Sequence, residues 1–290
     1  MLKPQHKSLA ADIGLFYAAA IWGTTFVLVK RAIAEIDPVI LVGYRFTLAG
    51  LLVTAVLLIK RKPVLMEWRK GLFLGFIIWL LYVPQTLGLK FTTASNSAFI
   101  TGLFVAFVPL FLLTLFKRKP TRWELAATGV ALLGLWVLTG GMAKINTGDA
   151  MTLITAMAYA LHLLYADKYM KQGVDPYIIS AQQFLFAGIF AVLTGVLSGA
   201  SFSARSSATI SIIIFLTVFP TLSAFVIQLM AQRIAAPLKV SLIFALEPVF
   251  AATFAWTVGG ERLILSGAVG GALIFAALVL SGISTSRQIR

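Results

Sequence analysis

Ten apolar stretches, each about twenty residues long, follow one another along the chain with short connections between them. They lie at about 13–31, 38–59, 71–89, 95–116, 123–142, 149–169, 177–198, 208–231, 237–257 and 263–284. A helix of about 20 residues crosses the roughly 30 Å apolar core of a bilayer and satisfies its own backbone hydrogen bonds there. The strands of a membrane barrel would instead alternate apolar and polar residues. We therefore predict an all-α integral membrane protein with ten transmembrane helices.

The composition excludes a soluble protein. Of the 290 residues, 60% are hydrophobic and 12% are charged, with a mean hydropathy of +0.95, whereas soluble domains carry about 25% charged residues. The chain has no cysteine, which excludes disulfides and thiolate metal sites. We attribute its net charge of +14 to basic loops at the cytoplasmic face of the membrane rather than to nucleic-acid binding. The expected partners are a small-molecule substrate and the lipid bilayer, and no metal or other cofactor is expected.

The distribution of positive charge predicts the orientation. If the N-terminus is cytoplasmic, the cytoplasmic ends and loops hold 17 of the Lys and Arg residues and the opposite connections hold 6, with Arg45 inside the second stretch. Positive residues accumulate in cytoplasmic loops. The sequence therefore predicts a multi-pass protein with both termini in the cytoplasm.

The two halves of the chain resemble each other. Asp37-Pro38 recurs as Asp175-Pro176, and Pro109 recurs as Pro248 at almost the same spacing, which is close to half the length of the chain. Each pair occupies the same point of its span. These spacings predict a duplication of a five-helix unit.

An odd number of spans per unit places the two units upside down relative to each other. Two first-half loops carry the basic clusters Lys60-Arg61-Lys62 and Lys117-Arg118-Lys119. The equivalent loops of the second half carry only Arg205 and Arg262, as expected if they face outward. Inverted repeats are an architecture of secondary transporters, with substrate bound near the midplane. The predicted units are residues 1–146 and 147–290.

One further set of residues, spread over nearly the whole chain, points to a family. It comprises Gly14, Trp22, Lys30, Pro38, Arg45, Pro109, Glu247-Pro248 and Gly260-Glu261-Arg262. In this pattern and in its plan of five plus five helices, the chain resembles the EamA-type drug/metabolite transporters. The resemblance implies export of small metabolites across a bacterial inner membrane, and the family includes amino-acid exporters.

Two charged residues within the spans are candidates for the mechanism. Of the ten acidic residues, only Glu247 lies in the middle of a span, and charges there are costly. Glu247 is interpreted as a proton-coupling carboxylate, as a neutral carboxyl that stabilises the kink at Pro248, or as the structural partner of Arg45. Arg45 could bind a substrate carboxylate or brace the fold.

The candidate substrate site combines aromatic faces with weakly polar groups. Trp22 and Tyr159 occupy matching places in the two halves, so they are expected to face one central cavity. His162 is interpreted either as part of this site or as a residue that forms a hydrogen bond between two helices. Pro84 and Pro220 are the expected hinges, because proline removes a helix hydrogen bond. The full set of predicted substrate-binding residues is Trp22, Tyr82, Gln85, Asn96, Phe99, Thr101, Tyr159, His162 and Gln228.

These observations predict a secondary transporter that exports amino acids, aromatic or otherwise apolar, and related amphipathic compounds by alternating access. The cavity is expected between spans 1, 3, 4, 6, 8 and 9, with hairpins 90–94 and 232–236 opening on opposite faces. A broad-specificity drug exporter is the alternative, followed by a channel or a scramblase. An enzyme is disfavoured, because the sequence lacks G-x-S-G, H-E-x-x-H and mid-span aspartates. The sequence allows either uniport or proton antiport. It also allows either a monomer or a homodimer.

Overall fold

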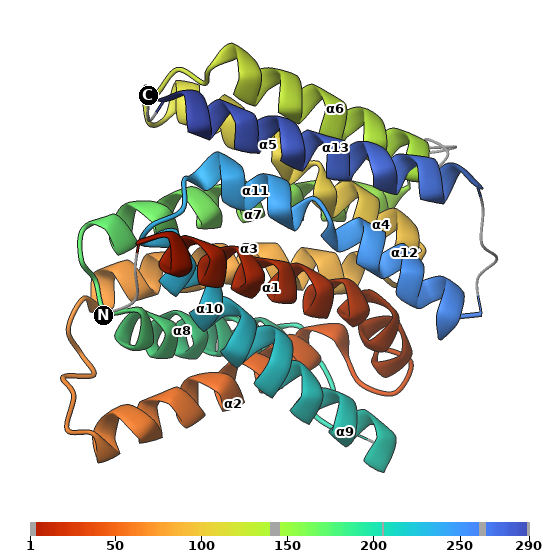
Figure 1. Cartoon of the computed structure of the whole chain (residues 1–290). Helices are drawn as coiled ribbons and strands as arrows, with labels where there is room; N and C mark the ends of the chain where they lie inside the picture. Colours follow the sequence, from red (N-terminus) through yellow and green to blue (C-terminus); the bar gives the residue numbers. More distant parts are fainter. Residues whose placement is uncertain (1–3, 140–145, 205, 261–264, 289–290) are drawn as a thin grey trace.

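The computed structural model describes residues 4–139, 146–204, 206–260 and 265–288, all the defined elements of which are helices (Figure 1). The elements are α1 (Pro4–Ala32), α2 (Pro38–Ile59), α3 (Trp68–Gly88), α4 (Ala94–Gly102), α5 (Phe104–Thr114), α6 (Arg122–Thr139), α7 (Thr147–Lys171), α8 (Pro176–Leu197), α9 (Ser207–Leu216), the π-helix η1 (Thr217–Ser223), α10 (Ala224–Gln232), α11 (Pro237–Phe244), α12 (Glu247–Thr257) and α13 (Leu265–Gln288).

Three of the predicted continuous helices are broken, which corrects the sequence interpretation. The fourth divides into α4 and α5, the eighth into α9, η1 and α10, and the ninth into α11 and α12. A proline ring clashes with the carbonyl four residues before it. Accordingly, α9 ends four residues before Pro220 and α11 ends four residues before Pro248. Pro109 and Pro84 behave differently: α5 begins five residues before Pro109 and continues through it, and α3 continues through Pro84.

Eight helical segments within the described residues are long and apolar enough to cross a membrane. The chain is therefore a multi-pass membrane protein. The segments α6 and α13 are not among the eight. They pack against each other at one edge of the molecule (Figure 1), where a side chain at Gly134 would meet the backbone of Gly270 and Ile274 within 3 Å.

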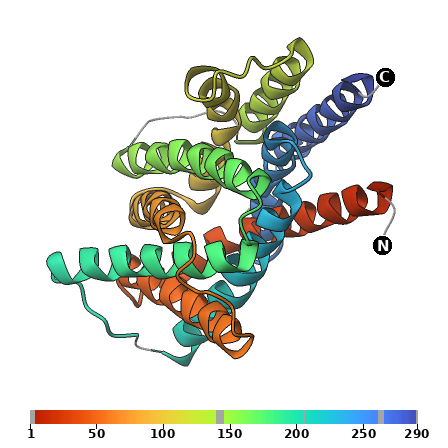
Figure 2. The same cartoon turned by 90° about the vertical axis from the view of Figure 1, so that its left-hand side faces the viewer.

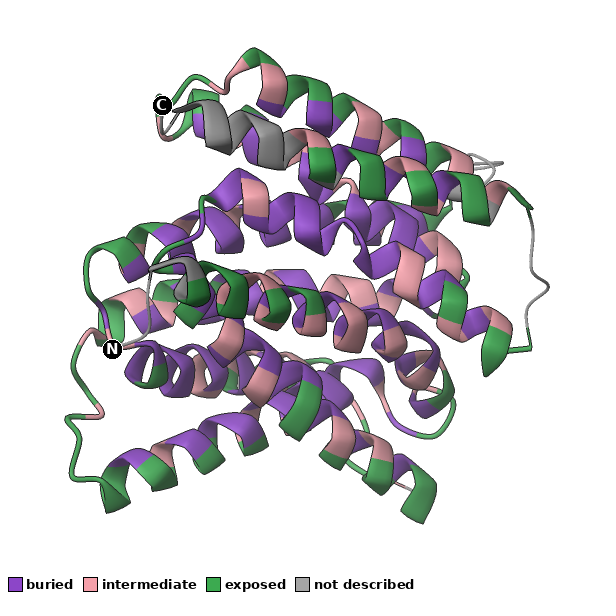
Figure 3. Ribbon diagram, viewed as in Figure 1, coloured by how far each residue is buried: buried purple, intermediate pink, exposed green. Residues whose placement is uncertain are grey.

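The core lies where α2, α3, α7 and α8 pack together, with α1 lying against α10 and α12. Buried residues fill this centre, whereas exposed apolar residues such as Leu51 and Leu193 cover the outer faces (Figure 3). Helices in lipid approach closely at small residues. At the crossing of α2 and α8, an added Cβ on Gly188 would lie 2.7 Å from the backbone nitrogen of Thr47, and one on Gly50 would lie 2.8 Å from that of Leu185.

The helices α2 and α8 begin in the same way. Asp37 accepts hydrogen bonds from the amides of the second and third residues of α2, at 2.8 and 3.4 Å, and Asp175 does the same for α8 at the same distances. A proline follows each aspartate at the first helical position, where its missing N–H costs nothing. The repeated Asp-Pro pair is thus a repeated helix start.

The described ends of α1 and α13 lie at the same end of the molecule, which faces the viewer in Figure 2. The connections 60–67, 115–121, 172–175 and 233–236 lie at this end too (Figure 1). Most of the basic residues outside the helices are in these connections. Some predicted charges, among them Lys144, Arg205 and Arg262, fall outside the described residues.

Candidate functional site

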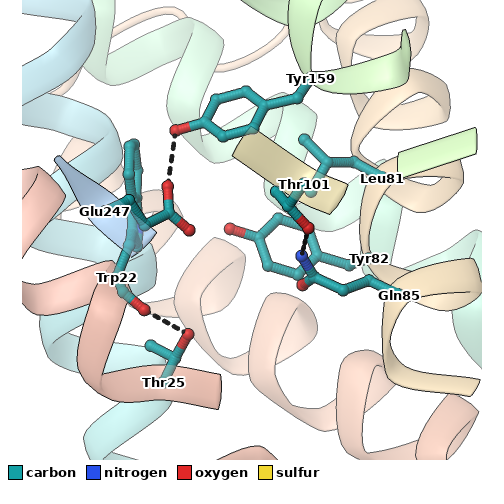
Figure 4. Close-up of a pocket in the computed structure, with 8 residues that line it drawn as sticks. All are labelled: Trp22, Thr25, Leu81, Tyr82, Gln85, Thr101, Tyr159 and Glu247. Atoms are coloured by element: carbon teal, nitrogen blue, oxygen red, sulfur yellow. Dashed lines mark hydrogen bonds between the residues drawn. The ribbon is translucent and has the colours of Figure 1, made fainter. Parts of the chain in front are cut away.

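A central cavity lies where α1, α3, α4, α7 and α12 meet, beside two of the helix breaks (Figure 4). All but one of its lining side chains are buried, with exposed fractions of 8% or less; Gln85 is half-buried. The open space holds about one water molecule. The lining residues are Trp22, Thr25, Leu81, Tyr82, Gln85, Thr101, Tyr159 and Glu247. The cavity is therefore too small for a metabolite until the helices separate.

Glu247 contributes a carboxyl group to the cavity. It is the first residue of α12, directly after the break from α11, and 5% of it is exposed. The Tyr159 hydroxyl donates a long hydrogen bond of 3.4 Å to its Oε2 atom (Figure 4). Among the described residues, no basic side chain forms an ion pair with it. The carboxyl group is thus held loosely and is available to a proton or a cationic group.

Arg45 lies next to the cavity without lining it. Its guanidinium carbon is 4.5 Å from the centre of the Tyr82 ring, and Tyr82 itself lines the cavity. The Nε atom donates to the Thr221 hydroxyl over 2.5 Å, and Nη2 is buried without a hydrogen-bond partner. The predicted structural partnership with Glu247 is not a direct ion pair; Arg45 instead contacts the ring of Tyr82 and the π-helix η1. A buried guanidinium with a free nitrogen has room for one more acceptor.

Aromatic rings form one wall of the cavity. The Trp22 and Tyr159 rings meet edge to face, with centroids 6.0 Å apart, and Tyr159 packs against Phe104 at 4.3 Å. The Trp22 Nε1 atom donates to the Pro220 carbonyl over 2.6 Å. This bond connects the cavity wall to η1, so a change in the π-helix would move the indole.

A polar pair forms the opposite wall. Gln85 in α3 donates from Nε2 to the Thr101 hydroxyl in α4 over 2.9 Å (Figure 4). One turn before Gln85, the Leu81 carbonyl accepts a hydrogen bond from Thr155 of α7 over 2.8 Å. This bond joins α3 to α7 near Pro84, where a proline has removed a backbone donor.

Four predicted site residues lie outside the cavity lining. Phe99 is 2% exposed in the core. His162 bonds to the Gln183 side chain over 3.0 Å, as its alternative interpretation predicted. Gln228 donates to Gln232 over 3.3 Å, and no described residue of the eighth predicted span lines the cavity. Asn96 donates a hydrogen bond to Asp149, where the first turns of α4 and α7 meet.

Sequence reasoning missed two lining residues, Thr25 and Leu81. Thr25 lies one helical turn after Trp22 and donates to its carbonyl over 2.7 Å. Residues three or four apart share a helix face, so Trp22 was a signal for Thr25. Leu81 had no signal beyond its position next to Tyr82, because one leucine in an apolar span resembles any other.

The comparison with known proteins decides the family. The model of the EamA-like transporter family matches twice, over residues 9–140 and 146–283. The chain belongs to the EamA-like transporter family. The predicted resemblance is confirmed, and so is the prediction of a membrane transporter rather than an enzyme.

Three named relatives are 25–30% identical to this chain. A transporter of Archaeoglobus fulgidus is 28% identical over 90% of this chain and 93% of its own length. A second A. fulgidus transporter is 30% identical over 64% of this chain and 59% of its own length, so the match spans less than two thirds of that relative. A probable amino-acid metabolite efflux pump of Salmonella typhimurium is 25% identical over 55% of this chain and 54% of its own. A crystal structure with a TM-score of 0.79, 18% identity and coverage of 96% and 98% of the two chains shares the fold.

Proposed function

We propose that the protein is a secondary transporter that exports small zwitterionic metabolites with an apolar part, above all apolar amino acids, across the bacterial inner membrane. The observation that carries this proposal is the composition of the cavity. It combines one buried carboxyl group, Glu247, with the aromatic faces of Trp22, Tyr82 and Tyr159, next to the guanidinium of Arg45. The Salmonella relative named as a probable amino-acid metabolite efflux pump supports the same substrate class.

The charges fit a zwitterion better than a simple cation or anion. A substrate ammonium group would pair with Glu247, which has no fixed cationic partner among the described residues. A substrate carboxylate would reach the free Nη2 of Arg45 once Tyr82 moves. The apolar side chain of the substrate would lie against the aromatic rings. Charge-assisted hydrogen bonds of this kind are stronger than neutral ones, so two of them account for selection of the zwitterion.

The same carboxyl group provides a means of coupling. A proton and a substrate ammonium group would compete for Glu247, because either one neutralises it in a site that excludes water. Only one of the two is then carried in each half of the cycle. The proposed mechanism is therefore proton antiport by alternating access, with Pro84 and Pro220 as bending points.

We further propose that residues 1–146 and 147–290 are inverted five-helix repeats. Two observations support this. The family model matches twice, with the matches meeting at residues 140–146. The packing of helices between the halves is also reciprocal. In the first half, α3, α4 and α5 pack on α7, the first helix of the second half. Their counterparts α10, α11 and α12 pack on α1, the first helix of the first half.

Cysteine labelling tests the proposed orientation, in which both termini are cytoplasmic. The chain has no cysteine of its own, so Ser8→Cys and Ser203→Cys each introduce a single thiol at an exposed position near one end of the bundle. In intact cells, an impermeant thiol reagent is expected to label Ser203→Cys and to leave Ser8→Cys unlabelled until the membrane is opened. The reverse pattern would invert the orientation, and equal labelling of both would contradict it.

Counterflow in proteoliposomes tests the substrate class. Vesicles loaded with unlabelled L-leucine are expected to take up labelled L-leucine saturably, and L-phenylalanine is expected to compete. Tyr82→Ala removes the ring that contacts Arg45 and should raise the apparent KM at least about tenfold, whereas Tyr82→Phe keeps the ring and should change it about threefold or less. Competition by tetraphenylphosphonium alone would favour the drug exporter, and uptake that does not saturate would favour a channel.

A further inference from the structure

Two polar contacts to an aspartate join helices of the bundle, one near each of its ends. At the end that carries the termini, Lys239 in α11 contacts both carboxylate oxygens of Asp12 in α1, at 2.7 and 2.8 Å. At the opposite end, Asn96 in α4 donates from Nδ2 to Oδ1 of Asp149 in α7 over 2.7 Å. Each contact joins an aspartate of a cavity-lining helix to the first turn of a helix that is broken near the cavity.

The two contacts occupy equivalent positions in the two halves of the chain. The spacing from Asp12 to Asp149 is the same as the spacing from Trp22 to Tyr159. Each aspartate precedes its cavity residue by ten positions, which is about 15 Å along a helix. Lys239 is the third residue of α11, and Asn96 is the third residue of α4. A single ancestral contact that is present twice in opposite orientations explains this arrangement.

The two contacts differ in strength. The side chains of Lys239 and Asp12 are 29% and 35% exposed, so water and salt weaken their attraction. Asp149 is 3% exposed and accepts two further hydrogen bonds, from the hydroxyl of Thr92 at 2.7 Å and from the amide of Asn146 at 3.0 Å. Hydrogen bonds to a buried carboxylate are costly to break, because the group has no water to turn to.

We propose that these contacts are the latches of two gates, and that their unequal strength makes the resting transporter open toward the end that carries the termini. This inference rests on the proposed alternating access and orientation, which make that end cytoplasmic. Both latches are closed in the present structure, where the cavity holds about one water molecule. The weaker latch, Lys239–Asp12, opens first and admits substrate from the cytoplasm. The stronger latch, Asn96–Asp149, yields only when the loaded transporter turns outward.

The test measures access to the cavity from each side without using any substrate. Thr25 lines the cavity, and in a chain without cysteine Thr25→Cys provides a single thiol there. The full-length protein is placed in right-side-out and in inside-out membrane vesicles and treated with an impermeant methanethiosulfonate reagent. With both latches intact, labelling is expected to be faster in inside-out vesicles.

Removing one latch should change labelling from one side only. Asn96→Ala is expected to raise the labelling rate from outside about tenfold, because it removes a hydrogen bond to a buried carboxylate. Lys239→Ala is expected to raise the rate from inside about twofold, because it removes an exposed ion pair. Lys171→Ala is the matched control: its ion pair with Asp167 at 2.7 Å lies within α7 and joins no second helix, so neither rate should change.

The proposal is overturned if Asn96→Ala leaves the outside rate unchanged, or if Lys239→Ala raises the outside rate instead of the inside rate. Thr92→Val provides the same test of the outer latch if Asn96→Ala does not reach the membrane, since it removes another side-chain donor to Asp149. Failure of the proposed substrate class is distinguishable, because it abolishes counterflow while these labelling rates stay as expected.

Discussion

Glu247→Gln is expected to reduce transport of L-leucine at least about tenfold, because a charged hydrogen bond to the substrate is worth about 1.5–3 kcal/mol. Glutamine has nearly the same size and can still accept the hydrogen bond from Tyr159. The fold should therefore persist, but the site loses both its negative charge and its ability to bind a proton. Uptake driven by a pH gradient is expected to disappear.

Two control variants sharpen this experiment. Glu247→Asp keeps the charge and should retain part of the activity. Glu124→Gln changes a glutamate that is also buried, at 8% exposure, but lies at the start of α6, where it accepts hydrogen bonds from the Thr121 amide and from Arg118. It should transport normally, since these partners lie outside the cavity lining. Normal gradient-driven transport by Glu247→Gln would show that the carboxyl group only stabilises the fold near Pro248.

Gly188→Ala is expected to cost about 1–3 kcal/mol of stability, the usual range for overpacking a tight interior. The new methyl group would lie 2.3 Å from the Thr47 hydroxyl oxygen and 2.7 Å from the Thr47 backbone nitrogen, so α2 and α8 would have to move apart. Gly129→Ala is the matched control, because nothing lies within 4 Å of the Cβ that it adds. It should leave stability unchanged or raise it, as alanine favours a helix by about 1 kcal/mol over glycine.

The stability of both glycine variants is measured by heating each protein in detergent. The fraction that stays monodisperse on size-exclusion chromatography is recorded at each temperature. The expected order of stability is Gly129→Ala at or above the wild type and Gly188→Ala clearly below it. Equal stability of the two variants would mean that the crossing of α2 and α8 is looser than the structure indicates.

Much of the candidate site could be predicted from individual residues. Glu247 is the single acidic residue in the middle of a span, and membrane burial makes such a charge informative. Trp22 and Tyr159 occupy matching places in the two halves of the sequence and meet in the cavity. His162, Gln228 and Phe99 also lie within predicted spans, but they do not line the cavity. Depth in the membrane follows from position along the chain, whereas the direction of a side chain around the helix depends on its neighbours.

The sequence by itself determined the membrane location, the positions of the apolar segments and the family. These depend on the local balance of apolar and charged residues and on the spacing of motifs, and both can be read along the chain. Tertiary structure alone decided that Arg45 contacts Tyr82 and Thr221 rather than Glu247, and that Asn96 meets Asp149. In an apolar bundle nearly every helix face is hydrophobic, so the pattern of residues does not specify which faces meet. Close packing at small residues and the few available polar partners decide that instead.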